Sequence, residues 1–193
     1  MGILKEKKKI VLWASGNGTN VENIIRFFEQ DAKVAVAGVF TNNPKAGVLQ
    51  RAANYNVPTE VCSNTDFEQG SVNKLLEKYQ PDLIVLAGFL RKIAPSTIAA
   101  YPNQIINIHP ALMPNFGGPG MYGMRVHQAV VAAKAEKSGI TIHYVTPHYD
   151  EGEIIFQATT AVSPEDTPER LAAKVHQLEY EHYPNVIANL LSS

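Results

Sequence analysis

Short apolar runs that lack polar alternation, separated by amphipathic segments, constrain the fold of this chain most. The runs lie at residues 9–13, 34–40 and 83–87, and the amphipathic segments at residues 21–28, 48–55 and 66–79. Such runs are typical of central strands covered on both faces, and the segments between them have helical spacing. The alternation predicts an α/β fold, a Rossmann-like three-layer sandwich with a mostly parallel sheet and right-handed crossovers.

The second part of the chain follows a different pattern. A loop rich in glycine, proline and methionine occupies residues 112–125, and a helix is predicted at residues 126–135. Strands are predicted at residues 139–145 and 153–160, and the short loop between them favours an antiparallel pair. The predicted sheet therefore gains an antiparallel strand in its C-terminal part.

The length of the chain predicts one domain. No internal repeat, low-complexity segment or linker interrupts residues 1–193, which fit a single core. We expect an N-terminal half of about residues 9–104 and a C-terminal half of about residues 105–193. The last helix is predicted to begin at Pro168, with Thr167 as its N-cap.

Composition limits the partners of the chain. With 45% apolar residues, 18% charged residues and a net charge of −1, it has no field that would gather nucleic acid or a membrane surface. The one basic run, Lys5 to Lys9, is predicted to be a solvated tail before the first strand. No segment is long enough to span a bilayer. Cys62 is the only cysteine, which excludes an internal disulfide and predicts a cytoplasmic protein.

Residues 105–110, Ile-Ile-Asn-Ile-His-Pro, carry two polar side chains on a predicted strand. Side chains two positions apart point to the same face of a strand, so we expect Asn107 and His109 side by side. Pro110 has no backbone donor and favours an extended His109, so the strand is expected to end there. Taken alone, such a pair is more often two satisfied polar groups at a strand exit.

A glycine turn, Gly16-x-Gly18, follows the first predicted strand and opens a helix. Backbone amides and the helix dipole bind phosphate at such a place. A dinucleotide fingerprint would require a third glycine where Val21 stands, and an acid after the second strand, where Thr-Asn-Asn stands. A single terminal phosphate is therefore favoured over a dinucleotide. The alternative is a tight turn with Thr19 or Asn20 as the helix cap.

The carboxyl ends of parallel strands meet at one edge of a sheet, where ligands bind. The glycine turn, residues 88–93 and the pair Asn107 and His109 all follow or end such strands, so we expect them to share one cleft. Asp150, on a later loop, is placed to reach this cleft, where it would raise the pKa of His109 and fix the orientation of the ring. The alternative role for Asp150 is that of a turn residue.

Six histidines raise the question of a metal site. None of them has a ligand spacing such as His-Glu-x-x-His. His127, His176 and His182 lie in predicted helices and are expected to be structural or exposed. We predict no metal.

Four blocks occur in order along most of the chain. They are Ser-Gly-Asn-Gly-Thr-Asn at residues 15–20, Leu-Ala-Gly-Phe-Leu-Arg at 86–91, Ile-Asn-Ile-His-Pro-Ala-Leu-Met-Pro at 106–114 and Val-Thr-Pro-His-Tyr-Asp-Glu-Gly at 145–152. In these blocks the chain resembles the family of glycinamide ribonucleotide formyltransferases. Asn-x-His-Pro with a downstream aspartate marks the wider folate-dependent formyltransferase superfamily, and the first block points to this branch. The resemblance implies the formyltransferase fold, with a phosphate-binding N-terminal half and a catalytic, folate-binding C-terminal half.

The resemblance also implies an activity and a set of site residues. It implies that 10-formyltetrahydrofolate, as co-substrate and without a metal, donates a formyl group to the amine of glycinamide ribonucleotide in purine biosynthesis. The implied catalytic residues are Asn107, His109 and Asp150. The implied binding residues are Gly18, Thr19, Asn20 and Glu179 for the nucleotide, and Leu90, Arg91, Lys92, Ile93 and Asn107 for the folate. The small-molecule substrates are the expected partners, and the chain is expected to be a monomer or a homodimer.

The chemistry of formyl transfer explains why these residue types are needed. Attack of an amine on the formyl carbon creates an oxyanion, to which Asn107 and a protonated His109 are expected to donate hydrogen bonds, with Asp150 keeping His109 cationic. Two alternatives stay open at this point. One is a formyltransferase acting on another amine, such as an amino-sugar nucleotide, and the other is a non-catalytic module that binds phosphate or folate.

Overall fold

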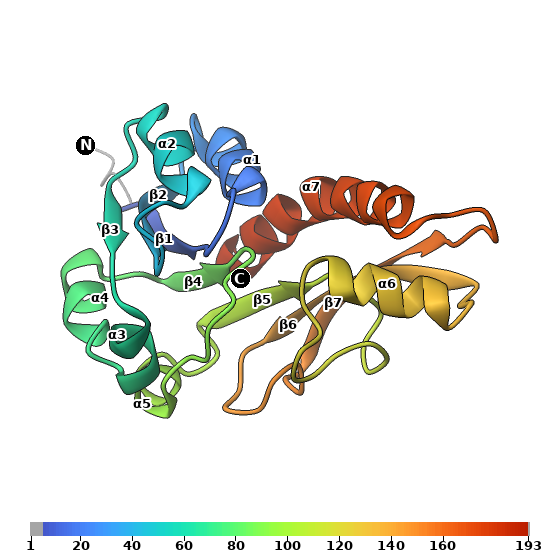
Figure 1. The fold of residues 1–193 in the computed structure, drawn as a ribbon. Coiled ribbons are helices and arrows are strands. Elements are labelled where there is room, and N and C mark those ends of the chain that lie inside the picture. Colours follow the sequence, from blue (N-terminus) through green and yellow to red (C-terminus); the bar gives the residue numbers. More distant parts are fainter. Residues whose placement is uncertain (1–5, 193) are drawn as a thin grey trace.

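A seven-stranded sheet forms the centre of the computed structural model, which describes residues 6–192 (Figure 1). The strand order is β3-β2-β1-β4-β5-β6-β7. The strands are β1 (Lys8–Trp13), β2 (Val34–Thr41), β3 (Thr59–Val61), β4 (Leu83–Leu86), β5 (Ile105–His109), β6 (Lys137–Tyr144) and β7 (Ile154–Ala161). All pairings from β3 to β5 are parallel, whereas β5–β6 and β6–β7 are antiparallel. The predicted fold class is confirmed.

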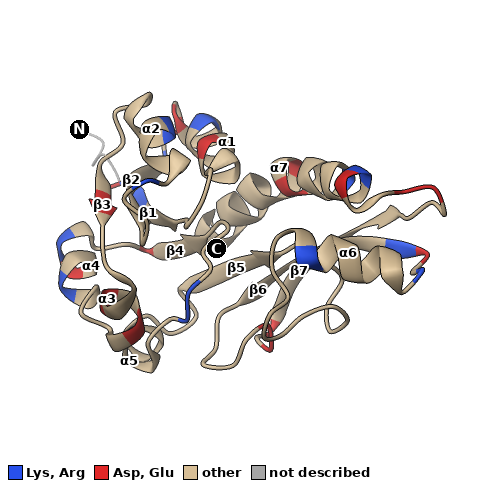
Figure 2. Cartoon of the chain, viewed as in Figure 1, with Lys and Arg blue, Asp and Glu red and all other residues tan. Residues whose placement is uncertain are grey.

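Helices cover both faces of the sheet (Figure 1). They are α1 (Thr19–Phe28), α2 (Gly47–Ala53), α3 (Asn64–Gln69), α4 (Asn73–Tyr79), α5 (Pro95–Ala100), α6 (Met124–Ala132) and α7 (Pro168–Ser192). Apolar residues of α1, α2, α6 and α7 pack on one face, and those of α3, α4 and α5 pack on the other. Figure 2 shows acidic and basic residues interspersed along α1, α4 and α7.

Strand β1 shows why the first apolar run has no polar alternation. Ile10 and Leu12 belong to the core beneath α1 and α7, whereas Val11 and Trp13 belong to the core beneath α3 and α4. All four side chains are fully buried. A strand that is covered on both faces has no position for a polar side chain, which is what the sequence of this run indicates.

Two predictions for the N-terminal half are wrong in detail. Residues 66–79, predicted as one helix, form α3 and α4, because Gly70 ends α3 with a left-handed φ of 83°. The basic run is not a free tail throughout, since β1 begins at Lys8, whose Nζ lies 2.7 Å from Asp82 Oδ1. Lys5, at the start of that run, lies outside the described residues.

The direction of β6 decides which side chains meet at the end of β5. The antiparallel pairing of β6 with β7 was predicted, but that of β6 with β5 was not. In this register His143 lies opposite Asn107, and Thr141 lies opposite His109. Cross-strand partners that lie directly opposite share one face of the sheet, so β6 adds a second histidine to the Asn107 and His109 pair.

Within residues 6–192, the structure contains no helix whose length and hydropathy would allow it to cross a bilayer.

Candidate active site

A cavity of about 810 Å³ opens at the carboxyl edge of the parallel strands. Its wall includes the three segments that were expected to share a cleft, at residues 16–20, 87–91 and 107–110. The sheet order reverses between β1 and β4, and this is the place where ligands bind in open α/β sheets. Residues 118–124 and parts of α6, α7 and the 145–152 loop complete the wall.

The glycine turn at the cavity has the backbone conformation of an open helix N-terminus. Gly18 is the N-cap residue of α1, with a left-handed φ of 77° and without a side-chain cap. The alternative in which Thr19 or Asn20 caps the helix is therefore wrong. A Cβ atom on Gly18 would lie 2.4 Å from Val48 Cγ2 of α2, so both the conformation and the space require glycine. The uncapped amides at the start of α1 remain available to an anion.

Arg51 of α2 holds this turn from behind. Its Nε donates to the backbone oxygen of Asn17 over 2.9 Å, and its Nη2 donates to Asn17 Oδ1 over 3.1 Å. The same guanidinium forms an ion pair with Glu22 of α1. Val48 supports the neighbouring position through a hydrogen bond from its backbone N–H to the oxygen of Gly16, over 3.2 Å. The turn is thus fixed by α2 rather than by its own side chains.

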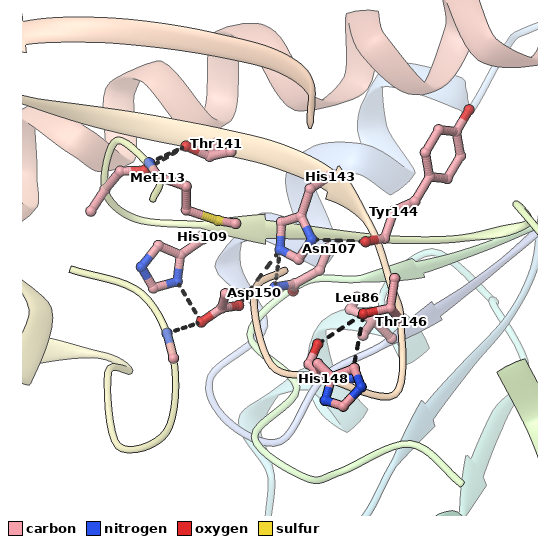
Figure 3. A network of polar contacts seen from close by, with 12 residues as sticks. Leu86, Asn107, His109, Met113, Thr141, His143, Tyr144, Thr146, His148 and Asp150 are labelled. Atoms are coloured by element: carbon pink, nitrogen blue, oxygen red, sulfur yellow. Dashed lines mark hydrogen bonds and ion pairs between the residues drawn. The ribbon is translucent and has the colours of Figure 1, made fainter. Parts of the chain in front are cut away.

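Asp150 lies between two histidines at the end of β5 (Figure 3). Its Oδ2 is 3.7 Å from His109 Nδ1, and its Oδ1 is 3.6 Å from His143 Nε2. Oδ2 also accepts a hydrogen bond of 2.8 Å from the backbone N–H of Gly118. Asp150 has a left-handed φ of 55°, which aspartate tolerates in turns. It is therefore a turn residue that also reaches the histidines.

His143 sets the orientation of the Asn107 amide. His143 Nδ1 lies 2.9 Å from the carbonyl oxygen of Tyr144, which can only accept, so Nδ1 carries the proton. In the neutral ring, Nε2 is then an acceptor and takes a hydrogen bond from Asn107 Nδ2 over 3.2 Å. An amide nitrogen has two N–H groups, so the second one is left for a ligand.

Burial of His109 acts against the expectation that Asp150 keeps the ring cationic. Its Nε2 lies 2.7 Å from the carbonyl oxygen of Phe116 and donates to it. Burial lowers the pKa of His109 below its ordinary value. The Asp150 carboxylate and the Phe116 carbonyl act in the opposite direction but do not offset the loss of solvent. A neutral ring leaves Nδ1 without a proton for Asp150, which agrees with a separation too long for a hydrogen bond.

The Asp150 carboxylate remains ionised. Burial by itself would raise its pKa, but the neighbouring rings of His143 and His109 and the Gly118 N–H donor outweigh burial and lower the pKa. The site therefore holds a fixed negative charge beside a neutral imidazole. An imidazolium that forms at His109 during a reaction would find its counter-ion already in place.

A second polar cluster lines the cavity at α7. Glu179 Oε2 accepts from Asn20 Nδ2 over 3.2 Å and from His176 Nδ1 over 2.9 Å. The hydrogen bond to Glu179 raises the pKa of His176. Glu179 is 7% exposed, and these two hydrogen bonds satisfy the buried Oε2 atom. Asn20 and Glu179, expected in one binding set, are in direct contact.

The residues expected to bind the folate divide between two hollows. Leu90 and Arg91 border the large cavity, whereas Lys92 and Ile93 border a smaller recess that adjoins it and is also lined by His148. Arg91, Asn107 and Asp150 border both hollows. The backbone N–H of Leu90 donates to Ser15 Oγ over 2.9 Å, which ties this segment to the glycine turn.

Sequence reasoning missed three histidines that belong to the site. His143 contacts Asn107 and Asp150, and both His127 and His176 line the cavity. His176 is exposed and His127 is buried, as the expectation of structural or exposed residues allows, but the sequence did not indicate that both line the cavity. Thr141 and His143 are two positions apart in the alternating β6 pattern, so they share one face of that strand. This spacing was a usable signal for His143. No signal in the sequence pointed to His127.

Within residues 6–192, no group of three or more His, Cys, Asp or Glu side chains is arranged to hold a metal ion. The chemistry of the site can be described with the side chains and backbone groups above.

Comparison with known proteins identifies the family. The model of one family, described as Formyl transferase, matches residues 8–187. This chain belongs to the formyl transferase family. The resemblance found in the four sequence blocks is thereby confirmed at the level of the family.

Three members of the formyl transferase family illustrate the similarity. The chain is 37% identical to "Phosphoribosylglycinamide formyltransferase, chloroplastic" of Vigna unguiculata, over 95% of the chain and 61% of the relative. It is 35% identical to phosphoribosylglycinamide formyltransferase of Bacillus subtilis, over 95% of both chains. The crystal structure of phosphoribosylglycinamide formyltransferase from Anaplasma phagocytophilum has a TM-score of 0.88 and 30% identity, over 97% of this chain and 88% of that chain. The chain thus spans about three fifths of the length of the plant relative.

Proposed function

We propose that this protein transfers the formyl group of 10-formyltetrahydrofolate to the amine of glycinamide ribonucleotide. The observation that carries the proposal is the meeting of Asn107, His109 and Asp150 in one cavity with an uncapped helix N-terminus. Formyl transfer to a phosphorylated amine needs both an anion site and a donor set for an oxyanion. The relatives named phosphoribosylglycinamide formyltransferase support this choice of reaction.

In our proposal, the nucleotide lies in the cavity in one orientation. In our proposal the phosphate lies at the turn formed by Gly18, Thr19 and Asn20, where the amides of α1 are open. Glu179, whose Oε2 is engaged by Asn20 and His176, binds the sugar part of the nucleotide through its other oxygen. The amine then lies at the end of β5, beside Asn107 and His109. The phosphate anchors the substrate, and the reacting nitrogen lies in the opposite part of the cavity.

The folate lies on the other side of the reacting atoms. We assign its binding to Leu90, Arg91, Lys92 and Ile93, together with Asn107, which borders both hollows. A co-substrate in the smaller recess places its formyl carbon between Asn107 and the amine. This arrangement holds the two reactants in one orientation, which is a large part of the advantage of an enzymatic transfer.

Asn107 stabilises the oxyanion in our mechanism. As the amine attacks, the carbonyl oxygen of the formyl group becomes negative and accepts a hydrogen bond from the free N–H of the Asn107 amide. His143 holds the other N–H, so the amide does not have to reorganise when charge develops. His143 is thus a positioning residue.

His109 moves the proton. Because the ring starts neutral, it accepts the proton that the attacking amine must lose, and the imidazolium is stabilised by Asp150. A bond from the amine to the formyl carbon forms, the bond from that carbon to the folate nitrogen breaks, and His109 returns the proton to the leaving nitrogen. The products are the formamide and tetrahydrofolate, and the enzyme is regenerated without a covalent intermediate.

The proposal is tested by mixing the purified protein with glycinamide ribonucleotide and 10-formyltetrahydrofolate and measuring release of tetrahydrofolate. We expect release that depends on the nucleotide and is absent with an amino-sugar nucleotide as acceptor. Release with the amino sugar alone would replace the proposed acceptor. Binding of both ligands without any release of tetrahydrofolate would leave only a binding module.

A further inference from the structure

His127 is a buried histidine that the mechanism above does not use. It lies in the first turns of α6, is 2% exposed, and borders the large cavity. Neither of its ring nitrogens forms a hydrogen bond with another residue in the part of the chain that the structure describes, and its Nδ1 is fully enclosed. Buried polar groups without a partner are rare and destabilising, so this ring calls for an explanation outside the unliganded protein.

The surroundings of His127 keep its ring neutral. Burial lowers its pKa to about 4, and the neighbouring His176 and His109 act in the same direction. A neutral imidazole has one N–H donor and one acceptor nitrogen. It therefore complements a ligand group that offers both an acceptor and a donor, and it has no charge to attract a phosphate.

The position of His127 lies between the two polar clusters of the cavity. Its ring centroid is 6.4 Å from that of His176, which is bonded to Glu179. It also lies close enough to His109 for that residue to contribute to the lowering of its pKa. The titratable groups that face it are thus His176 and Glu179 of α7 and His109 of β5, with Tyr180 on the same wall.

We infer that His127 is a substrate-binding residue, whose imidazole hydrogen-bonds the amide that joins the sugar of the ribonucleotide to its reacting amine. This inference rests on the proposed function, because it assumes a nucleotide that spans from the glycine turn to His109. The amide of glycinamide has one carbonyl acceptor and one N–H donor, and it lies in the segment between these two ends. A neutral ring at this place binds the amide without adding a charge beside His109 and Glu179.

A purely structural role for His127 would lead to a different experimental result. If His127 only filled space, His127→Phe would keep the volume of the ring and remove an unpartnered polar group, so the protein would lose no affinity for any ligand. If His127 binds the amide, the same change removes a hydrogen bond to the substrate. Thermal unfolding separates loss of fold from loss of binding in either case.

The experiment compares the wild type with His127→Phe, His127→Gln and the control His182→Phe. His182 is a histidine of α7 that does not border the cavity. We expect His127→Phe to raise the KM for glycinamide ribonucleotide by about tenfold, as for the loss of one hydrogen bond. The KM for 10-formyltetrahydrofolate should stay within twofold of the wild-type value. His127→Gln, whose amide places a donor and an acceptor close to the position of Nε2, should recover part of the loss.

A second measurement locates the contact. Protection against thermal unfolding by ribose 5-phosphate, which lacks the amide, should be the same in the wild type and in His127→Phe. Equal weakening of ribose 5-phosphate and of the full nucleotide would overturn the placement, as would an unchanged KM in both His127 variants. If the wild type itself formylates no ribonucleotide, the proposed function fails. If the wild type is active and both His127 variants have an unchanged KM, only the role of His127 fails.

Discussion

One face of the central sheet is built in two different ways. Beneath α3, α4 and α5, this face carries buried apolar side chains such as Val11, Trp13 and Ile84. On β5 and β6 the same face carries Asn107, His109 and His143. Loops cover it there, since the backbone oxygen of Phe116 contacts His109 and Asp150 lies beside the same ring (Figure 3).

Strand β5 shows how one strand can stabilise the fold and also carry the reactive side chains. Along β5, Ile106 and Ile108 point into the core beneath α6 and α7, and neither is more than 6% exposed. Burial of such a side chain stabilises the fold by about 1.5–3 kcal/mol. Because β5 is anchored by this face, its other face is free to hold Asn107 and His109. The part of the sheet face beneath α3, α4 and α5, the helical region, supplies rigidity. The part on β5 and β6 that loops cover, the loop region, supplies access for ligands.

The largest expected effect lies in the loop region. We expect His109→Ala to lower kcat by about 10²–10⁴, because the proton transfer loses its acceptor. Asn107→Ala, which removes the oxyanion donor, should lower kcat by about 10²–10³. Both variants should unfold near the wild-type temperature, since the apolar face of β5 is intact. Near wild-type turnover in either would remove that residue from the mechanism.

The opposite result is expected in the helical region. Leu76 of α4 is fully buried beneath this face of the sheet, and Leu76→Ala should lower the free energy of unfolding by about 2–5 kcal/mol. At a temperature where the variant is folded, its kcat should match that of the wild type. Chemical denaturation together with the formyl-transfer assay checks both parts. A kcat that falls tenfold in the folded variant would contradict the separation of the two regions.

The pH dependence of turnover sharpens the account of the loop region. Wild-type kcat should fall as the pH drops through the pKa of His109, which burial places below the ordinary value. The charge of Asp150 raises that pKa, so Asp150→Asn should shift the acid limb to lower pH, by about one unit or more. Turnover of the variant should also be lower at every pH. If the acid limb of the pH profile does not shift in Asp150→Asn, a group other than His109 controls it.

The smallest expected effect concerns the support of the glycine turn. Arg51→Met removes the donors that hold Asn17, and we expect the KM for the nucleotide to rise about fivefold, as for the loss of a charged hydrogen bond on the protein surface. The KM for folate should not change. Arg26→Met, an equal loss of charge on α1, is the matched control. If both variants raise the KM equally, the loss of positive charge is responsible, and not the loss of the hydrogen bonds to Asn17.

Much of the fold could be predicted because its signals are local. The apolar runs of β1, β2 and β4 and the helical spacing between them identify a parallel sheet, and Thr167 caps α7 as expected, with Arg170 N–H donating to its Oγ1 over 3.3 Å. The break between α3 and α4 was missed, although Gly70 marks it. A single glycine within a helical pattern is tolerated often enough that it does not reveal a break.

The sequence by itself determined the parallel half of the sheet, the open glycine turn and the common face of Asn107 and His109, because each depends on residues close together in the chain. Only the tertiary structure decided that β6 runs antiparallel to β5, that His143 thereby holds Asn107, and that His127 borders the cavity. It also decided that burial lowers the pKa of His109. The reason is physical: strand pairing and burial arise from contacts between residues far apart in sequence, and the loss of solvent at His109 outweighs the charge of Asp150.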